Sequence, residues 1–207
     1  MAEQKITNWV APDDKTGEFK RGQSQFRNFI KKGGEFPPEK GRYHLYVSYA
    51  CPWAHRTLIV RKLKGLEDII PYTSVHWHMA EKGWRFATAE DNDAPGDNQG
   101  KIVSNESSEI IRMFYTEFDD IIAPEYKSVD LFPASLQKEI EATNDGWTYN
   151  DINNGVYRSG FATKPEAYEK AVINSSLLWI GFDVVYVQHF KTNIRDIRSG
   201  TLIFTSG

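Results

Sequence analysis

The most informative stretch of this chain is residues 46–57, Tyr-Val-Ser-Tyr-Ala-Cys-Pro-Trp-Ala-His-Arg-Thr, which contains its single cysteine, Cys51. Before the cysteine, apolar and aromatic side chains alternate with polar ones over residues 43–49, which is the pattern of a half-buried strand. After it, apolar residues recur at helical spacing over residues 52–64. Pro52 suits the first turn of a helix, where its missing N–H has no partner to lose. The sequence therefore predicts a strand, a tight turn and a helix, with the cysteine at or beside the N-cap.

A cysteine at the start of a helix is a candidate nucleophile. The reactive form is the thiolate, and a free cysteine with a pKa of about 8.5 holds little of it at neutral pH. Helix N-termini lower the pKa of cysteines to about 3.5–7.5, because their unpaired N–H groups and dipole favour a negative charge. A lone cysteine is also often an inert buried side chain. The strand–turn–helix context and Pro52 favour the reactive interpretation of Cys51.

The bulk composition limits the class of protein. The chain has 207 residues, 40% of them hydrophobic, and a net charge of −3 without a basic block that would indicate nucleic-acid binding. No run approaches the roughly 18 apolar residues of a membrane span, and residues 1–22 lack the apolar core of a secretory signal. One cysteine excludes an internal disulfide framework, and the five histidines lack metal-ligand spacing. These features predict a soluble, metal-free, cytoplasmic protein.

Three segments follow one another along the chain. Residues 1–42 form an irregular arm, residues 43–118 an α/β domain, and residues 119–207 a helical domain. The arm is rich in Gly, Lys, Pro and Glu, and we expect it to pack on the rest of the protein through its scattered aromatic side chains, which are Trp9, Phe19, Phe26, Phe29 and Phe36.

The α/β domain is predicted to continue beyond its first helix, which ends near Gly65. A second strand is predicted at 69–77, a polar loop at 80–100 and a short strand at Lys101–Val103. The polar run Ser104–Ser108 opens the next helix. Its side chains supply N-caps, and the exposed N–H groups of the helix start can also bind an anion, so capping alone and anion binding are two open interpretations.

The remaining chain is predicted to be mostly helical. Two amphipathic stripes are separated by a predicted turn at residues 153–155, Asn-Asn-Gly, whereas residues 183–190 are β-like in composition. The stripes are Leu136, Ile140, Thr143 and Trp147, and then Ala167, Tyr168, Ala171, Val172, Leu178 and Trp179.

Several motifs in this order resemble the glutathionyl-hydroquinone reductases, the xi-class or omega-like glutathione S-transferases that include the yeast extracellular-mutant-four-like proteins. The resemblance covers most of the chain. The motifs are Ile6–Val10, the cysteine stretch Tyr46–Arg56, Ser74–Trp77, Ile102–Ser107, Asn153–Tyr157 and Asp183–Arg195.

The resemblance implies a thioredoxin-like N-terminal domain and an all-helical C-terminal domain. It implies an enzyme whose catalytic residue, Cys51, attacks the glutathione sulfur of a glutathionyl-hydroquinone and leaves a mixed disulfide that a second glutathione resolves. Glutathione is then the co-substrate, small aromatic hydroquinone-type conjugates are the substrates, and neither nucleic acid nor membrane is a partner. The family also implies a homodimer.

By position in the motifs, the resemblance assigns Glu106 and Ser107 to the γ-glutamyl end of glutathione. Trp53 and Arg56 complete the expected glutathione-binding set, and Tyr157 matches a tyrosine near the hydroquinone pocket. Alternatives stay open for three of these residues. Arg56 favours the thiolate or is merely solvated, Trp53 stacks on the aryl group or packs, and Tyr157 is a pocket residue or an ordinary half-buried aromatic.

The chain also departs from the family pattern. The family carries a strand with a Val-Pro pair, the cis-proline loop, before the run that begins at Ile102, and no Val-Pro occurs here between Cys51 and Ile102. Further family sequence is missing within Ile173–Phe182 and after Arg198–Gly200. Because two of these breaks interrupt runs that match the family on both sides, we hypothesise a shortened gene product. The loss of a central strand is expected to expose backbone hydrogen-bonding groups and apolar surface.

Three functions are therefore open. The first is a glutathione-dependent reductase of glutathionyl-hydroquinones. The second is a catalytically defective glutathione-transferase-like protein, and the third is a dehydroascorbate reductase or glutaredoxin-like thiol transferase that uses the same Cys51.

Overall fold

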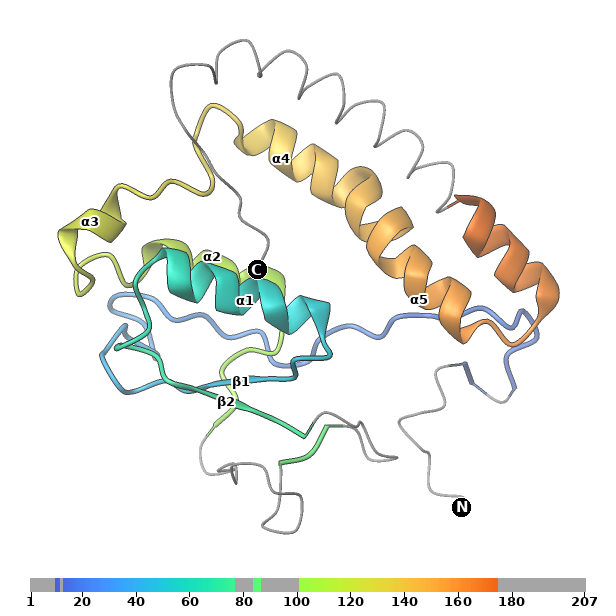
Figure 1. The fold of residues 1–207 in the computed structure, drawn as a ribbon, viewed down its shortest axis with the longest axis horizontal. Helices are drawn as coiled ribbons and strands as arrows, with labels where there is room; N and C mark the ends of the chain where they lie inside the picture. Colours follow the sequence, from blue (N-terminus) through green and yellow to red (C-terminus); the bar gives the residue numbers. More distant parts are fainter. Residues whose placement is uncertain (1–9, 12, 77–83, 87–100, 175–207) are drawn as a thin grey trace, which may run out of the picture. The chain divides into compact units, whose positions relative to one another are not determined.

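The computed structural model separates into two compact units, and each is described by itself. Of the described residues, the first unit contains those within Gly22–Ala134, and the second contains those within Trp9–Arg21 and from Ser135 onward. The division into three segments stays a prediction. The residues that the structure describes are 10–11, 13–76, 84–86 and 101–174 (Figure 1).

The first unit contains a strand, a helix and a second strand in succession. β1 (Leu45–Val47) leads into α1 (Pro52–Leu63), and β2 (Tyr72–Ser74) runs parallel to β1. Parallel strands need a crossover connection, which α1 supplies. The predicted strand, turn and helix around the cysteine are confirmed. The second predicted strand is present but is shorter than expected.

α1 ends in a glycine cap. Gly65 has a φ of +61°, in the left-handed region that favours glycine. Its N–H donates to the carbonyl of Lys62 over 3.0 Å, and the N–H of Leu66 donates to that of Arg61 over 2.9 Å. These two bonds form a Schellman motif, which satisfies carbonyls at the end of the helix. The predicted exit at Gly65 is confirmed.

The core of the first unit lies between the strands and two helices. α1 packs beside α2 (Ser107–Thr116), and the short α3 (Pro124–Lys127) follows (Figure 1). Along β1 the side chains alternate, since Tyr46 is 37% exposed and its two neighbours in the strand are buried. The buried cluster consists of Ile30, Phe36, Leu45, Val47, Leu66, Ile69, Ile70, Met113, Phe114, Phe118 and Ile122.

The strand predicted at Lys101–Val103 is wrong, because this segment has no strand geometry. The chain forms instead an isolated antiparallel bridge between Arg27 of the arm and Ser104. Two backbone bonds flank the bridge, from the N–H of Asn28 to the carbonyl of Val103 and from the N–H of Asn105 to that of Phe26, both 2.9 Å long. The bridge thus joins two residues that are about 77 positions apart in sequence, so that no local sequence pattern could predict it.

The arm packs through only some of its aromatic side chains. Phe19 and Phe36 are buried, as expected, whereas Phe26 is 42% exposed and Phe29 is 48% exposed. Trp9 lies outside the described residues. Between Gly22 and Ile30 the arm is therefore held mainly by backbone and polar contacts.

The second unit is helical, as predicted. α4 (Gln137–Thr143), the π-helical segment η2 (Asn144–Asn153) and α5 (Asn154–Phe161) form one continuous helix (Figure 1). The turn predicted at residues 153–155 is wrong, because Asn154 and Gly155 are buried inside this helix and packing overrides their weak helix propensity. Residues 165–174 are also helical.

The second predicted stripe is only partly visible. Ala167 and Ala171 are buried, whereas Tyr168 is 52% exposed. Leu178, Trp179 and the β-like residues 183–190 lie outside the described residues. No helix in the described part of the chain is long and apolar enough to cross a membrane.

Candidate functional site

Cys51 is the N-cap residue of α1, as the sequence predicts. Its backbone is extended, with φ −102° and ψ 110°, and its carbonyl accepts the N–H of His55 over 3.1 Å. The thiol group belongs to a half-exposed residue, and the first turn of α1 contains no acidic side chain. The only cysteine thus lies at the positive end of a helix dipole, without a neighbouring carboxylate in that turn.

Arg56 links the first half of α1 to the start of α2. Its Nε and Nη2 donate to the hydroxyl oxygen of Ser107 over 3.1 and 2.7 Å, and its Nη2 lies 3.8 Å from a carboxylate oxygen of Glu106. The guanidinium therefore contacts both residues that the family motif assigns to the γ-glutamyl group. A hydroxyl that accepts these bonds keeps its own proton as a donor.

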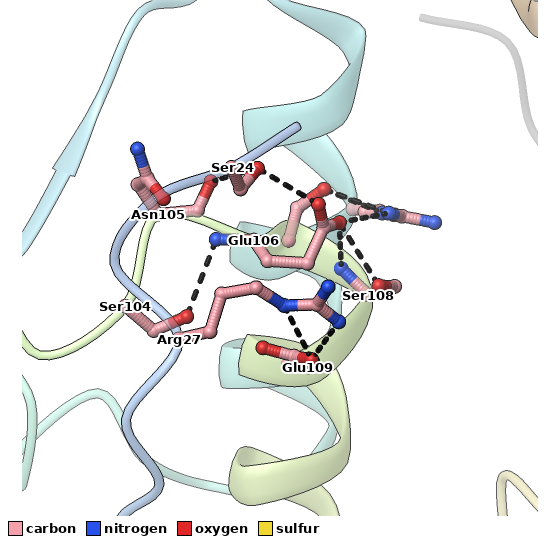
Figure 2. A network of polar contacts seen from close by, with 9 residues as sticks. Ser24, Arg27, Ser104, Asn105, Glu106, Ser108 and Glu109 are labelled. Atoms are coloured by element: carbon pink, nitrogen blue, oxygen red, sulfur yellow. Dashed lines mark hydrogen bonds and ion pairs between the residues drawn. The ribbon is translucent and has the colours of Figure 1, made fainter. Parts of the chain in front are cut away.

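Glu106 is the N-cap of α2, and its carboxylate is the centre of a polar network (Figure 2). One oxygen, Oε1, accepts from the backbone N–H of Ser108 over 3.2 Å and from its hydroxyl over 2.9 Å. The other oxygen, Oε2, accepts from the hydroxyl of Ser24 over 2.9 Å. Partial burial by itself raises the pKa of Glu106, but the bonds from Ser108 and Ser24 and the charge of Arg56 outweigh it, so that the pKa is lowered.

The backbone before α2 is held by the same group of residues. The hydroxyl of Ser104 accepts the N–H of Glu106 over 3.2 Å (Figure 2). The side-chain oxygen of Asn105 accepts the N–H of Phe26, also over 3.2 Å. Capping by this polar run is confirmed. Ser24 was not predicted to belong to this network, because a contact across 82 positions produces no local sequence pattern.

Two further α1 side chains lie near the cysteine in sequence. Trp53 is half-buried, and the guanidinium carbon of Arg56 lies over its ring, 4.9 Å from the centroid, in a cation–π arrangement. His55 is exposed. Both interpretations of Trp53, aryl stacking and packing, agree with this position.

Tyr157 belongs to the second unit, where it stacks on the arm. Its ring centroid lies 5.9 Å from that of Phe19 at an interplanar angle of 26°, and also 5.9 Å from that of Phe161. The guanidinium carbon of Arg21 lies 5.2 Å from the centroid of the tyrosine ring. Packing thus explains the position of the ring, and its role toward a substrate stays a prediction.

The first unit therefore brings together four of the predicted site residues. Trp53 and Arg56 are on the helix that begins at Cys51, and Arg56 contacts Ser107 and Glu106 at the start of the neighbouring helix. This arrangement provides a thiol, a carboxylate and hydroxyl donors near two helix N-termini. Among the described residues, no group of three or more His, Cys, Asp or Glu side chains is placed to hold a metal ion.

The chain is similar in sequence to curated glutathione transferases and reductases. It is 41% identical to "Glutathione S-transferase omega-like 2" of Schizosaccharomyces pombe in a match that covers 96% of this chain and 82% of that protein. It is 39% identical to the "Glutathionyl-hydroquinone reductase YqjG" of Escherichia coli over 88% of this chain and 75% of that protein. A scan of family models gave no match.

The alignment with the Schizosaccharomyces pombe protein extends over 262 residues, more than the 207 residues of the whole chain. Such an alignment requires positions at which the relative has residues and this chain has none. The internal deletions that the family resemblance implies are therefore supported by the comparison.

Solved structures agree with this relationship. The glutathione-S-transferase Xi of Phanerochaete chrysosporium matches with a TM-score of 0.71 and 40% identity, over 88% of this chain and 81% of that one. The Xi glutathione transferase ECM4 of Saccharomyces cerevisiae in complex with glutathione matches with a TM-score of 0.75 and 35% identity, over 88% of this chain and 71% of that one.

The fold is accordingly a thioredoxin-like unit followed by a helical unit, with a two-stranded sheet in the described part of the first. Sequence identity, coverage and fold all lead to the same assignment: the chain belongs to the xi-class, omega-like glutathione transferases, the enzyme family of the glutathionyl-hydroquinone reductases.

Proposed function

We propose that this protein is a glutathione-dependent thiol transferase that removes glutathione from glutathionyl-hydroquinones through Cys51. The observation that supports it best is the position of the single cysteine at the N-cap of α1, while Arg56 of the same helix contacts Ser107 and Glu106. A relative that is 39% identical is named a glutathionyl-hydroquinone reductase.

The reaction proceeds in two displacements on sulfur. The thiolate of Cys51 attacks the sulfur of the conjugate, an S–S bond forms, and the bond from sulfur to the aromatic carbon breaks. The electron pair of that bond stays on the carbon, which takes up a proton, so that the hydroquinone leaves. The thiolate of a second glutathione then attacks the mixed disulfide, releases Cys51 and forms glutathione disulfide. The thiols are oxidised and the conjugate is reduced, and no second cysteine of the chain is needed.

The start of α2 matches the two charges of the γ-glutamyl group. The Glu106 carboxylate, whose pKa is lowered by its hydrogen bonds, pairs with the α-ammonium. The proton of the Ser107 hydroxyl and the first N–H groups of the helix are donors to the α-carboxylate, with Arg56 next to it. Trp53, beside Arg56, forms part of the same glutathione site.

The finer assignments belong to the same proposal. Tyr157 contacts the hydroquinone ring, the protein acts as a homodimer, and the reaction takes place in the cytoplasm, where reduced glutathione is present as the resolving thiol. The substrates are small aromatic conjugates of glutathione.

The test combines turnover with mass spectrometry. Wild-type protein is expected to convert a glutathionyl-hydroquinone, and stopping the reaction before resolution is expected to leave one glutathionyl group on Cys51. Cys51→Ala is expected to show no turnover and no adduct, whereas His55→Gln, which changes an exposed side chain of the same helix, retains both. Turnover in Cys51→Ala, or an active wild type without an adduct, contradicts the proposal.

A second candidate function is supported by the alignment that is longer than the chain. If the deletions remove catalytic segments, the protein binds glutathione without turning over its conjugates. This candidate predicts that glutathione raises the melting temperature of a cooperatively folding protein, while no hydroquinone is released from the conjugate.

A further inference from the structure

The N-terminal arm is fixed to the start of α2 by a series of polar contacts, which we call the strap and define as Ser24–Ile30. The hydroxyl of Ser24 donates to Oε2 of Glu106 over 2.9 Å. Arg27 forms an ion pair with Glu109, and the backbone N–H of Ile30 points to the sulfur of Met113 at 2.9 Å. The strap thus follows the first two turns of α2, and Figure 2 shows Ser24 on one side of the Glu106 carboxylate and Ser108 on the other.

The two carboxylate oxygens of Glu106 have different donors. Ser108, two residues further along the chain, donates hydrogen bonds to Oε1 from its N–H and its hydroxyl. Oε2 accepts from Ser24, which comes from the strap. A carboxylate has about four lone-pair positions, so both oxygens are oriented and acceptor capacity remains for a ligand. Orientation before binding reduces the rotamer freedom that a ligand would otherwise have to remove.

Ser24 is not needed to hold the strap in place. The Arg27–Glu109 ion pair and the backbone bonds that join Phe26 and Asn28 to the segment before α2 hold it independently. Removal of the Ser24 hydroxyl therefore leaves the strap docked and takes one donor away from Glu106. The same hydroxyl also lies 3.5 Å from the carbonyl oxygen of Asn105, but its shorter bond, of 2.9 Å, is the one to the Glu106 carboxylate.

We propose that Ser24 is a positioning residue that holds the Glu106 carboxylate toward the α-ammonium of glutathione, and that the N-terminal arm is in this way part of the glutathione site. The inference rests on the proposed role of Glu106. It extends the site to a segment that precedes β1 and that contains none of the residues assigned to the site by the family motifs.

The test measures the binding of two ligands by calorimetry. One is glutathione, and the other is the glutathione analogue in which hydrogen replaces the α-amino group. Ser24→Ala is expected to weaken glutathione binding about 3–10-fold, which is in the range of the net contribution of a typical hydrogen bond, and to leave the binding of the analogue unchanged. Ser24→Thr keeps the hydroxyl and, unlike Ser24→Ala, is expected to bind glutathione like the wild type. Arg42→Gln, which removes an exposed ion pair with Glu39 outside the strap, serves as the control and is expected to bind both ligands like the wild type.

The outcomes separate this inference from the proposal on which it rests. If Glu106→Gln leaves glutathione binding unchanged, the role of Glu106 fails and the inference fails with it. If Glu106→Gln weakens binding and Ser24→Ala does not, only the inference on Ser24 is overturned. Equal weakening of both ligands by Ser24→Ala also overturns it, because the hydroxyl then has a general structural role. Thermal unfolding of each variant identifies any that is not folded, and Ser24→Thr remains as the second variant for that case.

Discussion

The guanidinium of Arg56 donates to the hydroxyl of Ser107 from two nitrogens, at 3.1 and 2.7 Å, and so joins the helix that begins after Cys51 to the helix that begins at Ser107. One side chain thus links two helix N-termini, one with the thiol and one with the residues proposed to bind the γ-glutamyl group. The planar fork of arginine makes this possible, because it presents several donors in a fixed geometry.

The first prediction concerns this fork. Arg56→Lys keeps the charge but loses the paired donation to Ser107 and the contact of the guanidinium with the Trp53 ring. We expect glutathione affinity to fall about 5–10-fold, which corresponds to about 1 kcal/mol. Calorimetric titration measures it, and Arg42→Lys, at an exposed ion pair with Glu39, is the matched control. An affinity equal to that of the wild type contradicts the proposed role of the fork.

The second prediction concerns pH. The pKa of Glu106 is lowered in the folded protein, so its ionised form contributes stability above the unfolded value of about 4.5, and that contribution is lost as the pH falls through the folded pKa. Glu106→Gln lacks this contribution. We therefore expect the difference in the free energy of unfolding between wild type and Glu106→Gln to be largest above pH 4.5 and to shrink in more acidic solution. Urea unfolding at a series of pH values measures it, and a constant difference contradicts the lowered pKa.

The third prediction concerns the end of α1. Gly65→Ala has two unfavourable effects. Alanine has to adopt a φ of +61°, and its methyl group collides with the ring of Tyr126. We expect a loss of about 2–5 kcal/mol in the free energy of unfolding, from backbone strain and overpacking together. Gly33→Ala has a similar φ of +70° but no atom within 4 Å of the new methyl group, so it isolates the backbone strain at about 1–2 kcal/mol. Equal losses in the two variants contradict the collision.

The fourth prediction separates the two interpretations of Tyr157. Tyr157→Phe keeps the stacking on Phe19 and Phe161 and removes only the hydroxyl. If the residue contacts the hydroquinone, KM for the conjugate rises while the melting temperature stays the same. Steady-state kinetics and thermal unfolding test this, and unchanged kinetics exclude a role of the Tyr157 hydroxyl toward the substrate.

Local sequence signals predicted the centre of the first unit well. The alternation of side chains over β1, Pro52 at the first helical position and Gly65 after the last turn are each a local effect of backbone geometry. They place Cys51 at the N-cap without any knowledge of the rest of the chain. The capping predicted for the run Ser104–Ser108 is also local, and in the structure Glu106 caps α2 through Ser108, two residues away.

The errors have a different physical origin. Asn154 and Gly155 disfavour a helix by themselves, but both are buried within α5, where tertiary packing decides the backbone. The segment Lys101–Val103 was expected to be a strand, yet it is followed by a single bridge from Ser104 to the arm. The Ser24–Glu106 contact could not be predicted either, because no local sequence pattern links the two residues.

The 82-residue separation of Ser24 and Glu106 has a consequence for the order of assembly. The loop between them has to close before their bond forms, whereas the turn of helix at Cys51 needs only its immediate neighbours. During synthesis the residues around Cys51 therefore leave the ribosome before Glu106 does, and they can make their local contacts before the bond between Ser24 and Glu106 is able to form. The nascent chain therefore exposes the Cys51 thiol before it contains the residues that are proposed to bind glutathione.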